Sequence, residues 1–116
     1  MKILIDWKSY KGELGKLVGE IAAVSPDILA GYKALSKAGD NTAHLDRKTR
    51  ELIALAVAVT RQCDGSITVH LDEAVKAGAT KEEIIEALGV AINVNAGATL
   101  VYSSRAIDAL LSKTPA

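Results

Sequence analysis

The sequence predicts an all-α fold, a compact helical bundle, and its composition indicates this in two ways. Nineteen of the 116 residues are alanine, none is phenylalanine, and one tryptophan and three tyrosines are the aromatic residues. Alanine favours close-packed helices, whereas sheets use aromatic and β-branched side chains. Apolar residues make up 49% of the chain, enough for a buried core, and the length fits a single domain spanning residues 1–116.

Turn and cap signals divide the chain into five or six helical segments. Trp7 to Val24 has apolar residues at spacings of three and four, typical of an amphipathic helix. Ser25-Pro26 supplies the cap and first position of a second helix, which ends near Gly39. Asp46 is the expected N-cap of a third helix that runs to about Gln62.

The second half of the chain contains the remaining segments. Asp64 is the expected cap of a fourth helix, which begins at 64–66 and has Gly78 just after its last turn. Thr80 and Glu83 have the spacing of a capping box at the start of a fifth helix. Asn95-Ala96-Gly97 predicts a break before a last helix.

Charge and cysteine content exclude several classes of protein. Lys and Arg together number 14, as do Asp and Glu, so nucleic acid is a poor partner for this chain. One cysteine allows neither an intramolecular disulfide nor a multi-cysteine zinc site, and no metal or cofactor is expected. The longest purely apolar run, Leu52 to Val59, is too short to cross a bilayer, and the N-terminus lacks a signal-peptide pattern. Only Ile3 to Ile5 resembles a strand. We therefore expect a cytoplasmic protein without a membrane partner.

Two segments, Leu52 to Val59 and Ile84 to Val101, are apolar on nearly every side. A helix without a polar face must be surrounded by protein, and a domain of this size has few such positions. We therefore expect a homo-oligomer, with a hexamer preferred over a trimer. The alternative is a central helix in a monomeric bundle.

A candidate site emerges around the third and fourth helices. Ser66 and His70 lie four residues apart, on one face of the fourth helix. Cys63 precedes the helix N-terminus, where free N–H groups and the helix dipole stabilise a thiolate. Glu51 lies on the preceding helix, which folds back if residues 63–65 form a tight turn. A carboxylate, an imidazole and two nucleophile positions would then converge.

These residues resemble the motif of the alkylhydroperoxidase D / carboxymuconolactone decarboxylase family in its small single-domain form. The thiol-active branch has a glutamate, eleven residues, a Cys-x-x-Cys pair, three residues and a histidine. Glu51, Cys63 and His70 match it, while position 66 is serine instead of cysteine. The similarity extends over roughly Trp7 to Leu110, including the segments 45–56, 77–84, 95–97 and 101–102.

The resemblance implies an all-α fold that assembles as trimers or hexamers, with peroxidase or disulfide reductase activity. In such enzymes the histidine, helped by the glutamate, deprotonates the second cysteine, which attacks a peroxide; the first cysteine then forms a disulfide with it. By position, Glu51 and His70 form the relay, Cys63 is the resolving thiol and Ser66 replaces the attacking thiol. The implied partners are a small-molecule peroxide and a dithiol or lipoyl reductant.

Ser66 leaves the function open, because a serine cannot complete a dithiol cycle within one subunit. Either the serine is an engineered exchange or the natural protein has lost the second thiol. The alternatives are a lactone decarboxylase or isomerase like the other branch of the family, and a non-catalytic oligomeric binding protein. A Ser66-His70-Glu51 hydrolase triad is disfavoured because the Gly-x-Ser-x-Gly turn is missing.

Overall fold

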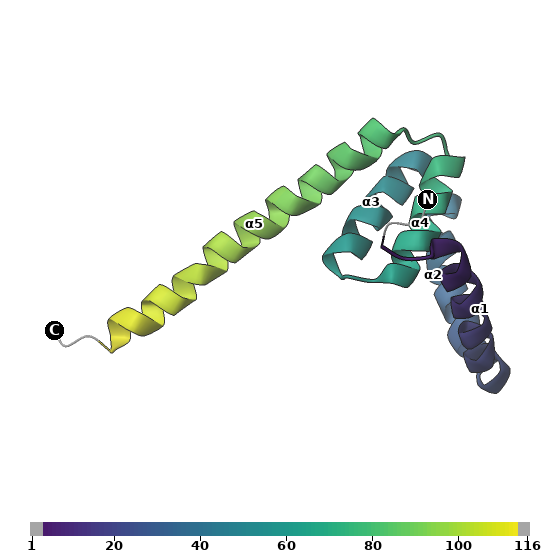
Figure 1. The fold of residues 1–116 in the computed structure, drawn as a ribbon, viewed down its shortest axis with the longest axis horizontal. Coiled ribbons are helices and arrows are strands. Elements are labelled where there is room, and N and C mark those ends of the chain that lie inside the picture. The colour runs from purple at the N-terminus through teal and green to yellow at the C-terminus, as the bar shows by residue number, and fades with distance from the viewer. Residues whose placement is uncertain (1–3, 114–116) are drawn as a thin grey trace.

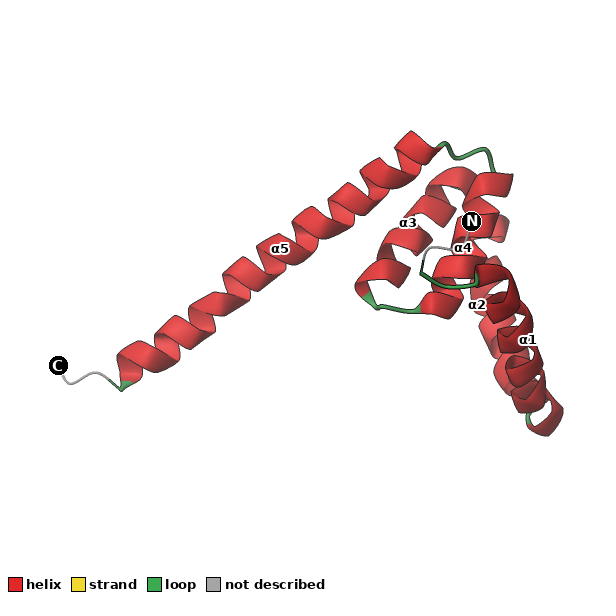
Figure 2. Ribbon diagram, viewed as in Figure 1, coloured by secondary structure: helices red, strands yellow, loops and turns green. Residues whose placement is uncertain are grey.

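The computed structural model describes residues 4–113, and within that range the chain is all helical (Figures 1 and 2). The five helices are α1 (Trp7–Val24), α2 (Pro26–Thr42), α3 (Arg47–Thr60), α4 (Asp64–Lys76) and α5 (Lys81–Ser112). The predicted fold class is confirmed. Leu4 and Ile5 do not form the strand suggested by the sequence, and Ile3 lies outside the described residues.

The core lies where α3 packs against α4 and against the first part of α5. Its buried apolar residues are Leu55 and Ala58 on α3, Ala74 on α4 and Ala91 on α5. Thr68 of α4 is buried among them. Because most of these side chains are small, the helices approach each other closely, as the alanine-rich composition predicts.

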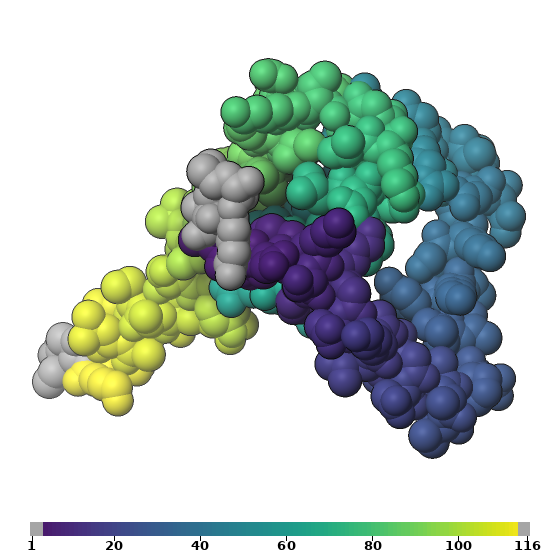
Figure 3. All heavy atoms as spheres, turned by 45° about the vertical axis from the view of Figure 1, so that its right-hand side comes forward, coloured from purple at the N-terminus to yellow at the C-terminus, as the bar shows by residue number. Residues whose placement is uncertain are grey.

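Two arms extend from this core in different directions (Figures 1 and 3). One is the hairpin of α1 and α2, which meets the core where α1 packs against α4. There Gly65 makes a close approach feasible, since a Cβ at that position would lie 2.8 Å from Leu14 Cδ2. Lys11 of α1 also pairs with Asp72 of α4. The other arm is the C-terminal part of α5.

Most helix starts agree with the sequence prediction, with one change of capping residue. Asp46 caps α3 by accepting a hydrogen bond from Thr49 N at 2.8 Å. The Thr80–Glu83 capping box is complete. Helix α4 begins at Asp64 as predicted, but its N-cap is Cys63, whose sulfur accepts from a backbone N–H in the first turn. Asp64 is already helical and therefore cannot be the cap.

The predicted break at residues 95–97 is wrong, because α5 continues through it without interruption. Asn95 Nδ2 donates to Ala91 O at 2.7 Å, so the amide bonds to its own helix instead of forming a turn. Gly97 costs helix stability without ending the helix, since no proline removes a backbone donor here. Two other boundaries also shift: α2 continues past Gly39 to Thr42, and α3 ends at Thr60 instead of Gln62.

Helix α5 is long and apolar enough to span a membrane, judged by length and composition alone. Of its most apolar 18-residue window, 6% is buried within the chain. The sequence analysis compared only uninterrupted apolar runs with the thickness of a bilayer, so it interpreted Ile84 to Val101 as a subunit contact and did not consider it as a membrane span.

Two substitutions at left-handed backbone positions should change stability in opposite directions. Gly78 follows α4 with φ 93° and Ala43 ends α2 with φ 52°. Gly78→Ala should lower the free energy of unfolding by about 1 kcal/mol, and Ala43→Gly should raise it by somewhat less. Urea unfolding of both variants measures this. Equal effects in the same direction would contradict the backbone explanation.

Candidate functional site

The turn between α3 and α4 positions the candidate site at one end of both helices. Gln62 adopts a left-handed conformation with φ 53°, and Cys63 N donates to Ala58 O at 3.1 Å. This reverses the chain within three residues, so α4 folds back along α3 as the sequence predicts. Side chains from the two helices therefore face each other.

Cys63 is exposed at the N-terminus of α4 and is stabilised in its thiolate form by Ser66. Its sulfur lies 3.2 Å from Ser66 Oγ and 3.4 Å from Ser66 N. The Ser66 hydroxyl, followed by its backbone N–H, lowers the pKa of the Cys63 thiol below its ordinary value. Both groups can donate to a thiolate, which is why they favour the ionised sulfur.

The approach of Glu51 to the imidazole of His70, expected from the sequence, is present. His70 Nδ1 and Glu51 Oε2 lie 2.7 Å apart, and both side chains are largely covered. In the neutral tautomer that carries its hydrogen on Nδ1, that nitrogen donates to the carboxylate and Nε2 keeps a lone pair. A base oriented in this way by a carboxylate is the arrangement used in general acid–base catalysis.

A hollow of about 480 Å³ brings these groups together. It is lined by Cys63, Ser66 and His70, together with Ala54, Val57, Ala58 and Arg61. The sequence analysis missed Arg61. Its position two residues before the cysteine was visible, but only the turn after α3 makes it line the same hollow as Cys63 and His70. Among residues 4–113 no acidic side chain pairs with it, so its charge is available to a ligand.

Ser66 and His70 line the same hollow but share no direct hydrogen bond in the described chain. The Ser66 hydroxyl instead contacts Cys63, three residues earlier. The cause is the position of Cys63 as N-cap, which brings its sulfur back over the first turn of α4. Any proton transfer between residue 66 and His70 therefore needs a water or substrate oxygen between them.

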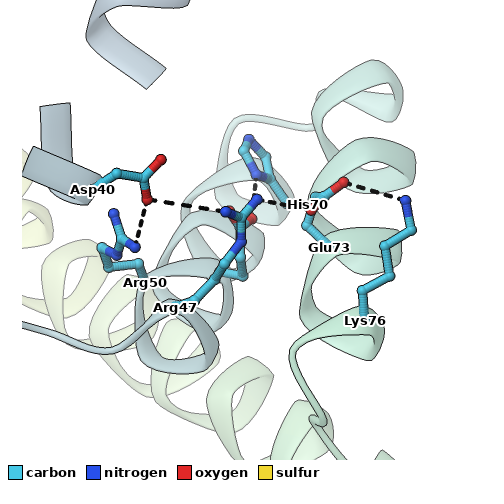
Figure 4. A network of polar contacts seen from close by, with 7 residues as sticks. Asp40, Arg47, Arg50, His70, Glu73 and Lys76 are labelled. Carbon is cyan, nitrogen blue, oxygen red and sulfur yellow. Dashed lines mark hydrogen bonds and ion pairs between the residues drawn. The ribbon is translucent and has the colours of Figure 1, made fainter. Parts of the chain in front are cut away.

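Ion pairs behind the site fasten α2, α3 and α4 together (Figure 4). Asp40 at the end of α2 bonds Arg50 at 2.7 Å, and Arg47 bonds Glu73 of α4 at 2.9 Å. Arg50 lowers the pKa of Asp40, and Arg47 lowers that of Glu73. Lys48 lowers the pKa of Glu83, and the ion pair between them joins α3 to the start of α5.

These lowered pKa values predict a loss of stability in acid. Asp40, Glu73 and Glu83 have pKa values below the ordinary 3.8 for Asp and 4.5 for Glu. Their contribution is therefore complete above the ordinary values and disappears as the pH falls through the lowered ones. The free energy of unfolding should decrease between about pH 5 and pH 3, less steeply in Asp40→Asn. Urea titrations across this range measure it, and an unchanged slope in the variant would contradict the assignment.

Among residues 4–113, no group of three or more His, Cys, Asp or Glu side chains is placed to hold a metal ion. The chemistry available at the site is that of one thiol, one hydroxyl, a histidine–glutamate pair and a guanidinium.

The fold and the site together define the class of protein. It is an all-helical protein with a thiol at a helix N-terminus beside a histidine–glutamate pair. The model of the carboxymuconolactone decarboxylase family matches residues 26–109, which include the whole site. The chain belongs to this family, which includes enzymes.

Two sequence relatives and one solved structure are similar to this chain over most of its length. An uncharacterized protein of Haemophilus influenzae is 49% identical over 104 residues, covering 90% of this chain and 92% of the relative. A protein encoded in the cox locus of Paracoccus denitrificans is 38% identical, over 80% of this chain and 84% of its own length. The crystal structure of an apo carboxymuconolactone decarboxylase family protein from Legionella pneumophila superimposes with a TM-score of 0.72. It is 33% identical and covers 91% of this chain and 95% of its own.

Proposed function

We propose that this protein is a thiol-dependent hydroperoxide reductase in which Cys63 reacts with the peroxide. The observation that carries the proposal is the position of the Cys63 sulfur. It caps α4, accepts a hydrogen bond from Ser66 N, shares a second hydrogen bond with Ser66 Oγ and lines the same hollow as His70. The family resemblance alone would place the attacking thiol at position 66, where this chain has a hydroxyl.

The first step transfers one oxygen atom to sulfur. The Cys63 thiolate attacks a peroxide oxygen, an S–O bond forms and the O–O bond breaks. The leaving alkoxide takes up a proton that His70 has accepted from the thiol, while Glu51 holds the imidazole in place. The products are a Cys63 sulfenic acid and an alcohol.

An external reductant with two thiol groups completes the cycle. The first thiol condenses with the sulfenic acid, forming a mixed disulfide and releasing water. The second thiol attacks this disulfide, regenerates Cys63 and leaves as the oxidised reductant. A dithiol of the lipoyl type supplies both groups.

The decisive experiment compares the wild-type protein with Cys63→Ser. Serine is a favourable N-cap, so the variant keeps the start of α4 while losing the thiol. The wild type should consume an alkyl hydroperoxide in the presence of a dithiol, and without the dithiol its mass should increase by one oxygen. The variant should show neither effect. Equal peroxide consumption by both proteins would contradict the proposal.

A lactone decarboxylase or isomerase is the second candidate, and Arg61 is the observation that favours it. Arg61 lines the hollow with His70, so a guanidinium that reaches into it would hold a substrate carboxylate while the imidazole moves a proton. This chemistry needs no thiol. Cys63→Ser should leave it intact, whereas Arg61→Gln should weaken substrate binding. A protein inactive in both assays would fit a non-catalytic oligomeric binding role.

A further inference from the structure

The hollow that contains Cys63 is lined by one permanently charged residue, and its charge is positive. Among the described residues that line it, Arg61 alone is an arginine, lysine, aspartate or glutamate. Two carboxylates lie nearby without lining it: Glu51 is bonded to His70, and Asp64 belongs to the first turn of α4. The lining of the hollow therefore favours an anion over a cation.

The end of α3 fixes the backbone of Arg61 next to the site. Arg61 is the C-cap of the helix, and its N–H donates to Val57 O at 3.0 Å. Gln62 follows in a left-handed conformation and turns the chain toward Cys63. Because Arg61 and Cys63 are two residues apart, their Cα atoms are at most about 7 Å from each other. A ligand group bound by Arg61 is therefore held close to the sulfur.

The side chain of Arg61 has no partner within residues 4–113. The two other arginines of α3, Arg47 and Arg50, each bond a carboxylate. Arg61 is exposed, and no described residue forms a hydrogen bond or an ion pair with its guanidinium. Its charge also interacts favourably with the C-terminal end of α3, but that interaction leaves the N–H groups of the guanidinium free. These N–H groups are available to a ligand.

The size and the walls of the hollow indicate the kind of anion. Its volume of about 480 Å³ is that of a site for a small molecule. Ala54, Val57 and Ala58 supply apolar surface beside the arginine. A carboxylate on a short carbon skeleton suits both features, because its two oxygens match the planar guanidinium and its carbon atoms cover the apolar wall. A phosphate dianion carries two charges, and a single arginine neutralises only one of them.

We infer that the substrate of this site carries a carboxylate and that Arg61 binds it as the specificity-determining residue. For the peroxide chemistry the inference rests on the proposed function, and the substrate is then a small hydroperoxy carboxylic acid. Its carboxylate is held by Arg61 while its peroxide group meets Cys63. Arg61 takes no part in breaking the O–O bond, so it acts on substrate binding and not on the chemical step. The lactone chemistry would use the same anchor.

The first test measures the preference for an anion without using a peroxide. Iodoacetate and iodoacetamide alkylate a thiolate by the same reaction and differ by one negative charge, and Cys63 is the single cysteine. Arg61→Gln should lower the ratio of the iodoacetate to the iodoacetamide rate constant by about tenfold, because the attracting charge is lost. Arg61→Lys should keep most of the ratio. Lys76→Gln, which removes one positive charge at the other end of α4, should leave it unchanged.

Two results of the alkylation experiment would overturn the inference. One is a ratio that Arg61→Gln does not change, even if urea unfolding shows a loss of stability, since Arg61 would then serve only the end of α3. The other is an equal fall of the ratio in Lys76→Gln, because the net charge of the protein would then attract the reagent.

The second test measures substrate preference and separates this inference from the proposed function. Cumene hydroperoxide carrying a para carboxylate is compared with its methyl ester, in the presence of a dithiol. Arg61→Gln should raise the KM for the acid by about tenfold and leave kcat and the kinetics of the ester unchanged. An unchanged KM for the acid would overturn the inference.

A wild type that consumes neither hydroperoxide would contradict the proposed function but not the carboxylate site. Benzoate and benzamide then replace the hydroperoxides as probes. Benzoate should protect Cys63 from iodoacetamide at about tenfold lower concentration in the wild type than in Arg61→Gln, whereas benzamide should not distinguish the two proteins. Equal protection of both proteins by benzoate would overturn the inference.

Discussion

Ser66→Cys is expected to convert this protein from one that depends on external thiol into one that forms an internal disulfide. Residue 66 already holds its hydroxyl oxygen 3.2 Å from the Cys63 sulfur, and the two residues are separated by one helical turn. The new thiol would therefore attack the oxidised Cys63 within the same subunit. Compared with millimolar external thiol, this should accelerate that step by roughly 10³-fold or more.

Stopped-flow peroxide consumption and the mass of the oxidised protein measure this effect. After one equivalent of peroxide the variant should have lost two hydrogens, whereas the wild type should have gained one oxygen. Ser66→Ala is the matched control. It removes the hydroxyl that lowers the pKa of Cys63, so that pKa should rise and the reaction at neutral pH should slow. A Ser66→Cys protein that stays in the sulfenic acid form would contradict the geometry.

His70→Ala, made in the Ser66→Cys protein, is expected to produce a loss that depends on pH. At pH 7 thiol reactivity should fall by about 10²-fold, because the oriented base that removes the proton is gone. At pH 9 most of the reactivity should return, since a thiol with a pKa of about 8.5 ionises without help. Glu51→Gln should show a smaller loss with the same pH dependence.

His44→Ala provides the control for this experiment. His44 is exposed in the segment before α3, away from the hollow, so its removal should leave both rates unchanged. Alkylation by iodoacetamide at the two pH values reports the reactivity. If His70→Ala lost the same factor at pH 7 and pH 9, His70 would not be the base.

The sequence determined the local structure because the relevant interactions lie within a few residues. The N-cap at Asp46, the Thr80–Glu83 capping box and the left-handed Gly78 each depend on neighbouring residues alone. The contact between Glu51 and His70 could also be predicted from the sequence, because a tight turn after α3 makes α4 fold back along α3.

Only the tertiary structure decided where the side chains of the site point. The sequence placed Ser66 and His70 on one face of α4, but only the structure shows that the Ser66 hydroxyl forms its hydrogen bond with the Cys63 sulfur. The position of Arg61 was also decided by the tertiary structure, because the turn that follows α3 brings this residue to the hollow.

The local sequence likewise did not predict that α5 is one continuous helix. Asn95 and Gly97 are turn residues by propensity, yet the uninterrupted helix keeps their backbone hydrogen bonds, and Asn95 adds one to Ala91. Propensity differences of about 1 kcal/mol per residue are too small to end a helix when the remaining residues favour it. Local sequence therefore set the helix caps, whereas packing and the turn geometry between helices set the site.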